Sequence, residues 1–130
     1  MHDPVPPITV PALVAGYGRV SLLTSDGELL ALTRSEAVTM LRDMDPPLVV
    51  HAPSSARRLG LRQIVAYDLL ELFAFVLPAR SAAPTPRGLA LALGYEADAI
   101  GDADASLLPE LAGMLLELSL IHISEPTRPY

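Results

Sequence analysis

The stretch "IVAYDLLELFAFVLP", residues 64–78, decides the fold of this chain. A short β-like run ends at Tyr67, a segment of Leu, Phe and Val follows, and one carboxylate, Asp68, stands between them. This pattern predicts a strand and then a buried helix over 68–77, which ends because Pro78 cannot continue it. Asp68 is then either a catalytic acid at the end of a strand or a helix cap. Glu71, three residues later, favours the cap, because carboxylates near a helix start accept from free N–H groups and oppose the helix dipole.

The residues before this stretch alternate between strand and helix patterns. Three β-like runs are expected at 12–15, 19–24 and 28–32, and Ser25-Asp26-Gly27 predicts a hairpin between the last two. "TRSE" at 33–36 has the spacing of a capping box, and Ala37, Met40 and Leu41 are expected on the inward face of the helix. "LVVHA" at 48–52 predicts a strand buried on both faces.

The other helices are expected from their caps. "SSARRLG" predicts a helix with a serine cap that stops at Gly60, and Thr85 with Pro86 predicts one that stops at Gly94. Ser106 is expected to open a last helix, with Leu107, Leu111, Met114 or Leu115, and Leu118 on one side. The order of elements predicts an α/β fold, in which an antiparallel hairpin lies beside parallel strands in a mixed sheet flanked by helices.

Length and composition bound the class of protein. The 130 residues suffice for one domain, and there is no cysteine to form disulfides or thiolate sites. Neither a secretory signal nor an apolar run of roughly 20 residues is present, so we expect a cytoplasmic protein without a membrane partner. Residues 88–117 carry six acids and no base, so a nucleic-acid contact is expected from the first two thirds of the chain. Arg57, Arg58 and Arg62 are the candidates for phosphate contacts, although a solvated helix face also explains them.

The two ends of the chain differ from the middle. Residues 1–11 are a Pro-rich lead-in, and residues 12–117 are expected to form the domain. The last stretch, "LSLIHISEPTRPY" at 118–130, changes composition abruptly and resembles the translation of a transposase sequencing adapter. The resemblance implies that the chain is a truncated piece of a longer protein; an ordinary C-terminal tail is the alternative.

Several common catalytic motifs are missing from the sequence. It contains no G-x-x-x-x-G-K-[ST], no G-x-S-x-G and no H-E-x-x-H. His2, His51 and His122 are far apart along the chain, and we interpret His51 as a structural residue. We therefore expect no metal site and no cofactor in this piece.

Four segments in order resemble the proofreading-type 3′–5′ exonucleases with the RNase H-like fold. They are "LVVHAP", "YDLLEL", "RGLALALGY" and "GDADASLLPEL", which together span about residues 48–117. That resemblance implies four acids that hold two metal ions, which activate water and stabilise the leaving oxygen.

The acids of that family are only partly present here. Asp68 matches the third acid, and Asp104 or Asp102 matches the fourth. The first motif has no counterpart, because residues 11–25 contain no Asp or Glu, and the second motif places Ala52 and Ala56 where the family has Asn and Asp. The His or Tyr expected before the fourth acid is also absent. The resemblance therefore implies a nuclease that has lost its activity, with Asp68 and Asp104 as vestigial acids.

A longer run, "YDLLELFAFVLPARSAAPTPRGLALALG" at 67–94, resembles the N-terminal exonuclease-like region of bacterial ATP-dependent DNA helicases of the DinG type. In those superfamily 2 proteins the motor follows this region, so the resemblance implies DNA as partner, a missing C-terminal motor, and ATP and Mg²⁺ bound only there. The expected role of this piece is structural or DNA-positioning. The alternatives are an active 3′–5′ exonuclease and a small non-catalytic interaction domain.

Overall fold

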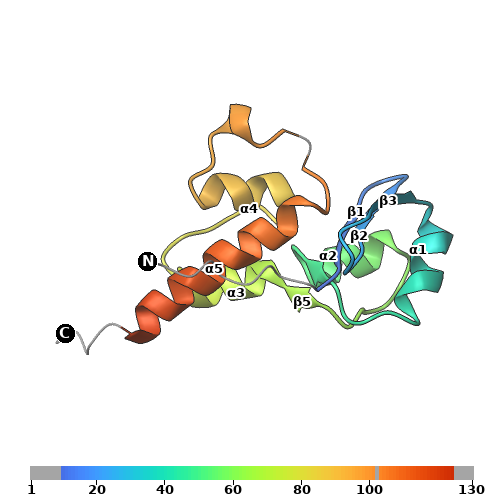
Figure 1. Ribbon diagram of the computed structural model, residues 1–130, viewed down its shortest axis with the longest axis horizontal. Coiled ribbons are helices and arrows are strands. Elements are labelled where there is room, and N and C mark those ends of the chain that lie inside the picture. The colour runs from blue at the N-terminus through green and yellow to red at the C-terminus, as the bar shows by residue number, and fades with distance from the viewer. Residues whose placement is uncertain (1–9, 102, 125–130) are drawn as a thin grey trace.

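The computed structural model describes residues 10–101 and 103–124, which form a mixed five-stranded sheet with helices on both faces (Figure 1). The strands are β1 (Ala12–Ala15), β2 (Val20–Leu23), β3 (Leu29–Leu32), β4 (Leu48–Val49) and β5 (Tyr67–Asp68). The α-helices are α1 (Arg34–Leu41), α2 (Ala52–Arg58), α3 (Leu69–Val76), α4 (Pro86–Ala92) and α5 (Leu107–Ser124), and a 3₁₀ turn η1 covers Ala97–Ala99. The predicted α/β class is confirmed.

The strand order in the open sheet is β3-β2-β1-β4-β5. β1 pairs antiparallel with β2, and β2 with β3, whereas β1, β4 and β5 run parallel. The antiparallel hairpin set beside parallel strands is therefore as predicted, and the order is compatible with the RNase H-like fold that the resemblance implies. The parallel strands end at one edge of the sheet, and the candidate site lies there.

Each face of the sheet has its own hydrophobic core. Leu13 and Val49 face a core with α1 and α2, while Ala12 and Leu48 face a second core built with α3, α4 and α5. The two sets alternate along β1 and β4, because successive strand side chains point to opposite faces. β4 is thus covered on both sides, as its unbroken apolar run predicts. It is shorter than the predicted strand over 48–52, because His51 is already the N-cap of α2 and Ala52 its first residue.

The strand β5 is shorter than the predicted one. Tyr67 N–H donates to the carbonyl of Pro47 at 2.9 Å, and the pairing stops at that point. A parallel ladder extended backward would need an N–H at Pro47, and proline has none. Residues 64–66 therefore run beside the sheet without joining it, with Val65 78% exposed.

Of the predicted caps of α1 and α2, one is confirmed, and the other cap and one inward position are wrong. The capping box of α1 is confirmed, since Thr33 Oγ1 accepts from the N–H of Glu36 and Glu36 Oε1 accepts from the N–H of Thr33. The expected inward position of Met40 is wrong: Ala37 is buried, and Met40 lies at the rim of this short helix with 36% exposure. The predicted serine cap of α2 is also wrong, because the helix begins at Ala52 with His51 at the N-cap.

The helix α5 begins at Leu107, after a turn in which Asp104 Oδ1 accepts from the N–H of Ser106, and it lies against α3 and α4 (Figure 1). Leu107, Leu111 and Leu115 are buried as predicted, and Leu118 packs partly buried against the same core. The helix runs to Ser124 and so continues across the expected boundary at residue 118. Within 10–101 and 103–124, none of the helices has the length and apolar character required to cross a membrane.

Candidate nucleic-acid interface

The carboxyl ends of β1 and β4 lie side by side because the two strands are parallel. In open α/β sheets ligands bind outside the carboxyl ends of such strands. The loop of Gly16 to Arg19 leaves β1 at this edge, and His51 with α2 follows β4. Two hollows of ≈ 390 Å³ and ≈ 330 Å³ adjoin here and share Gly16, Tyr17, Arg34 and Arg58. We call them together the basic cleft.

The lining of the basic cleft is polar and positively charged. It consists of Gly16, Tyr17, Gly18, Arg19, Val20, Thr33, Arg34, Ser35, Ser54, Arg57 and Arg58. Four of these side chains are guanidinium groups, and no carboxylate belongs to the described lining. Such a surface attracts anions, and arginine recognises phosphate through paired N–H groups.

Tyr17 is the most exposed aromatic side chain of the described chain, at 91%. The backbone explains its position: Gly16 N–H donates to the carbonyl of Arg19 at 2.9 Å, and this tight turn displays the side chain between them. A Cβ on Gly16 would lie 3.0 Å from the same carbonyl oxygen, so a larger residue fits poorly there. The tight turn at Gly16 thus holds the Tyr17 ring outward.

The guanidinium group of Arg58 lies against one face of the Tyr17 ring. Its guanidinium carbon lies 4.7 Å from the centre of the Tyr17 ring, which is cation–π distance. Its Nη1 also donates to the carbonyl of Ala15 at 2.9 Å, so the half-buried side chain is tied to the end of β1. One face of the ring is therefore occupied, and the opposite face is open to solvent.

The predicted phosphate-binding residues fall into two groups. Arg57 and Arg58 line the basic cleft, whereas Arg62 lies outside its described lining, beyond the end of α2. Arg34, which was not predicted as a phosphate contact, lines the cleft from the first turn of α1. The capping box fixes that turn, and the N–H and hydroxyl of Thr33 hold the pKa of Glu36 below its usual value.

Of the two acids that the exonuclease resemblance matches, Asp68 is a helix cap, whereas Asp104 is hydrogen-bonded to Ser106 in the turn before α5. Asp68 Oδ1 accepts from the N–H of Glu71 at 2.9 Å, and Asp68 Oδ2 accepts from the N–H of Ala52 at 2.8 Å. One carboxylate therefore caps the start of α3 and also accepts the free N–H at the start of α2. Asp104 Oδ1 accepts from the backbone N–H of Ser106 at 2.9 Å and from its hydroxyl. The cap interpretation of Asp68 agrees with this geometry, and its bond to Ala52 is an addition to it.

The positions where the exonuclease resemblance expects further acids hold other residues. A small hollow of ≈ 20 Å³ between the ends of β1 and β4 is lined by Leu13, Val14 and Ala15 on the β1 side. On the β4 side, His51 Nδ1 lies 3.0 Å from Ser54 Oγ, a local pair at the start of α2. Ala56 is 1% exposed. Within residues 10–101 and 103–124, no three His, Asp or Glu side chains are placed to share a metal ion.

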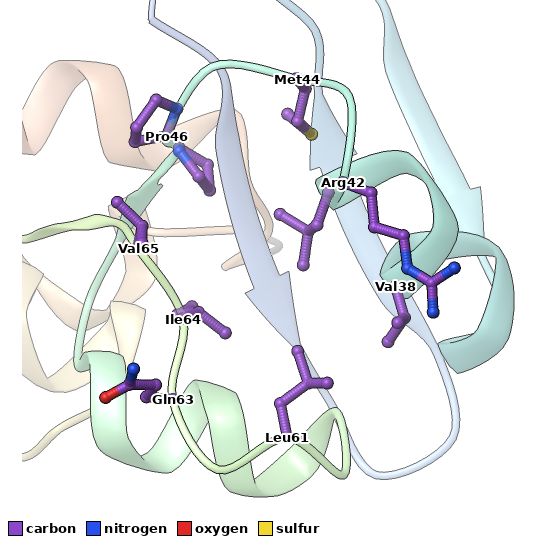
Figure 2. A pocket seen from close by; sticks show the side chains of 10 residues that line it. Val38, Arg42, Met44, Pro46, Leu61, Gln63, Ile64 and Val65 are labelled. Atoms are coloured by element: carbon purple, nitrogen blue, oxygen red, sulfur yellow. The ribbon is translucent and has the colours of Figure 1, made fainter.

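A second hollow lies between α1 and the segment before β5 (Figure 2). Its volume is ≈ 250 Å³, and its lining residues are Val38, Leu41, Arg42, Met44, Pro46, Pro47, Leu61, Gln63, Ile64 and Val65. Figure 2 shows the apolar side chains around the opening, with Arg42 and Gln63 as the polar ones. This groove is an extension of the core beneath α1, and it supplies no acid, base or nucleophile.

Tyr17 was not among the residues predicted from the sequence, although a local pattern marks it. An aromatic residue between two glycines, Gly16-Tyr17-Gly18, is typical of a turn that exposes the side chain, because glycine weakens a strand interior and favours turns. Its partner Arg58 is 41 positions away, so the pair itself has no local pattern.

No family model matches the chain, and searches among curated proteins and solved structures give no match either.

Proposed function

We propose that this chain is a non-catalytic, DNA-positioning module of an ATP-dependent DNA helicase, and that it holds single-stranded DNA in the basic cleft. The observation that carries the DNA-binding part is the Tyr17 ring, 91% exposed and backed by Arg58 in a cleft without a described acid. The helicase part rests on the resemblance of residues 67–94 to the DinG-type region.

The cleft has the two elements that single-strand binding needs. An aromatic face stacks on any unpaired base, and flanking arginines neutralise successive phosphates. In this chain the free face of Tyr17 takes the base, while Arg34 and Arg57, both exposed, reach the backbone phosphates. Arg58 stiffens the ring and adds positive charge behind it. Duplex DNA offers no unpaired base to Tyr17, so the cleft favours single strands.

The first prediction concerns affinity for DNA. Tyr17→Ala is expected to weaken binding of a fluorescein-labelled oligothymidylate roughly ten-fold, since stacking on one aromatic is worth about 1–3 kcal/mol per base. Arg57→Ala is expected to weaken it less and to reduce the slope of log affinity against log salt by about 0.7, one phosphate contact on a single strand. Fluorescence anisotropy over a salt series measures both quantities.

Arg62→Ala is the matched control, because it removes the same charge from the same region but outside the cleft lining. Its affinity and salt slope should stay near those of the unchanged chain. Equal losses for Arg57→Ala and Arg62→Ala would point to non-specific attraction by positive charge, and an unaffected Tyr17→Ala would remove the stacking role.

The second prediction concerns catalysis. The purified chain is expected to leave 3′-labelled single-stranded DNA intact in Mg²⁺ or Mn²⁺, because Ala52 and Ala56 stand where the exonuclease family has Asn and Asp, and residues 11–25 contain no Asp or Glu. The measurement is a gel time course over a metal titration. Metal-dependent digestion that Asp68→Asn abolishes would replace this proposal by the alternative, a 3′–5′ exonuclease; digestion that Asp68→Asn leaves unchanged would come from a contaminant.

The helicase part has its own test. In the intact reading frame we expect G-x-x-x-x-G-K-[ST] downstream of this region, in a motor that binds ATP and Mg²⁺ and works in the cytoplasm. A stop codon shortly after residue 117 would remove the helicase and favour the small non-catalytic interaction domain. The DNA-binding result does not depend on this outcome.

A further inference from the structure

The outer edge of the sheet is formed by β3, whose sequence Leu-Leu-Ala-Leu contains neither charge nor proline. Among the described residues, β3 pairs with β2 alone. Edge strands in monomeric proteins are usually protected by charges, prolines, bulges or a covering element, because their free backbone groups pair readily with another strand. Leu29 is 47% exposed and Ala31 is exposed as well, so neither the backbone edge nor these side chains are covered.

The hydrogen-bond phase of the hairpin determines which backbone groups of β3 are free. The N–H of Thr24 donates to the carbonyl of Glu28 at 2.8 Å, and bonded pairs alternate along an antiparallel ladder. With the register Leu22↔Leu30 and Ser21↔Ala31, residues 28, 30 and 32 face β2. Leu29 and Ala31 therefore direct both N–H and C=O away from the sheet.

Both ends of this free edge are closed. The N–H of Thr33 is taken by Glu36 Oε1 at 2.9 Å, as part of the capping box of α1. At the other end Gly27 turns the chain with φ +92°. The edge thus offers the backbone N–H and C=O groups of Leu29 and Ala31. A second strand with the same two residues free would complete a short antiparallel ladder.

From this geometry we infer that β3 is the interface for a second copy of the chain, in which Leu29 pairs with the partner's Ala31 and Ala31 with the partner's Leu29 about a two-fold axis. This register satisfies the free groups of both copies and sets the large Leu29 against the small Ala31 on one face. Leu30 meets Leu30 of the partner subunit on the other face, beside the core beneath α1. A two-fold interface is self-complementary in this way.

The charges around β3 fit the same register. Asp26 and Glu28 lie at the hairpin end of the strand, and Arg34 lies just beyond its other end. Antiparallel pairing brings the acidic end of one copy toward Arg34 of the other, twice in the dimer. A parallel arrangement would instead set like charges together, so the charges select the antiparallel pairing.

The test is the oligomeric state of the chain between about 10 µM and 1 mM. A ladder of two residues from each copy is a small interface, so we expect weak association that this range can measure. Sedimentation equilibrium of the unchanged chain should show the apparent mass rising from 13.8 kDa toward twice that value. Ala31→Pro should remain at the monomer mass, because it removes an N–H that faces away from β2 and proline is tolerated on such an edge. Ala31→Ser keeps the N–H and should still dimerise.

Leu29→Lys is the second variant, and it should also weaken dimerisation at least ten-fold, since it replaces the exposed apolar side chain by a charge. Circular dichroism checks that each variant remains folded. If Ala31→Pro does not fold, Leu29→Lys alone tests the interface. A single 13.8 kDa species over the whole range would overturn the inference. Dimerisation of Ala31→Pro and Leu29→Lys equal to that of the unchanged chain would overturn it too.

Discussion

Asp68→Ala is expected to lower the free energy of unfolding by about 2.5–4 kcal/mol, because it removes two helix-end contacts with one side chain. Loss of an N-cap costs about 1 kcal/mol, and a hydrogen bond to a charged acceptor contributes about 1.5–3 kcal/mol. The N–H of Glu71 would lose its cap at the start of α3, and the half-buried N–H of Ala52 would lose its partner at the start of α2. Urea unfolding followed by circular dichroism measures the change.

Asp68→Asn separates the two contacts. Asparagine caps a helix as well as aspartate does, so its carbonyl oxygen can keep one of the two N–H groups. Its amide nitrogen then faces the other N–H, and two donors cannot bond to each other. We therefore expect a loss about half that of alanine. Equal stability of Asp68→Asn and the unchanged chain would mean that the second contact contributes nothing.

Phe73→Ala is expected to be the most destabilising single change considered, at about 3–5 kcal/mol, which is the usual range for truncating a buried phenylalanine. Phe73 is 1% exposed and lies on α3 in the core shared with α5. Its removal leaves a cavity between helices that cannot collapse fully. The same urea experiment should show this loss as a lower transition midpoint, with the slope little changed.

Phe75→Ala is the matched control, because it makes the same change on the same helix at a side chain that is 77% exposed. Its effect should stay within about 0.5 kcal/mol, as for most surface substitutions. If the two variants lose equal stability, α3 does not bury the face that contains Phe73, and the packing of α3 against α5 is wrong.

The two roles of Asp68 bear on the proposed function. Each oxygen of Asp68 accepts one backbone N–H, so this carboxylate has a structural role at the starts of α2 and α3. Within residues 10–101 and 103–124, Asp68 belongs to no group of three His, Asp or Glu side chains that could share a metal ion. The proposed DNA-binding role needs neither Asp68 nor Asp104, since its residues come from the loop after β1 and from α1 and α2.

The sequence by itself determined the local elements. The four residues from Thr33 to Glu36 contain the whole capping box, so the start of α1 could be predicted together with its partners. Gly60 and Gly94 both have positive φ after their helices, as their positions predict. The apolar run at β4 likewise predicted burial on both faces. In each case the interacting groups lie within about one helical turn or alternate along one strand, so a short pattern contains the information.

The tertiary structure alone decided the features that join distant segments. Asp68 lies 16 residues from Ala52, and Arg58 lies 43 residues from Ala15. No local pattern specifies such pairs, because they depend on how the parallel strands bring α2, α3 and the β1 loop to one edge. β5 is also shorter than its own sequence predicts, because its ladder with β4 stops at Pro47, which has no N–H. The basic cleft around Tyr17 therefore arises from strand order and packing, while the helices and strands that build it could be predicted from the chain.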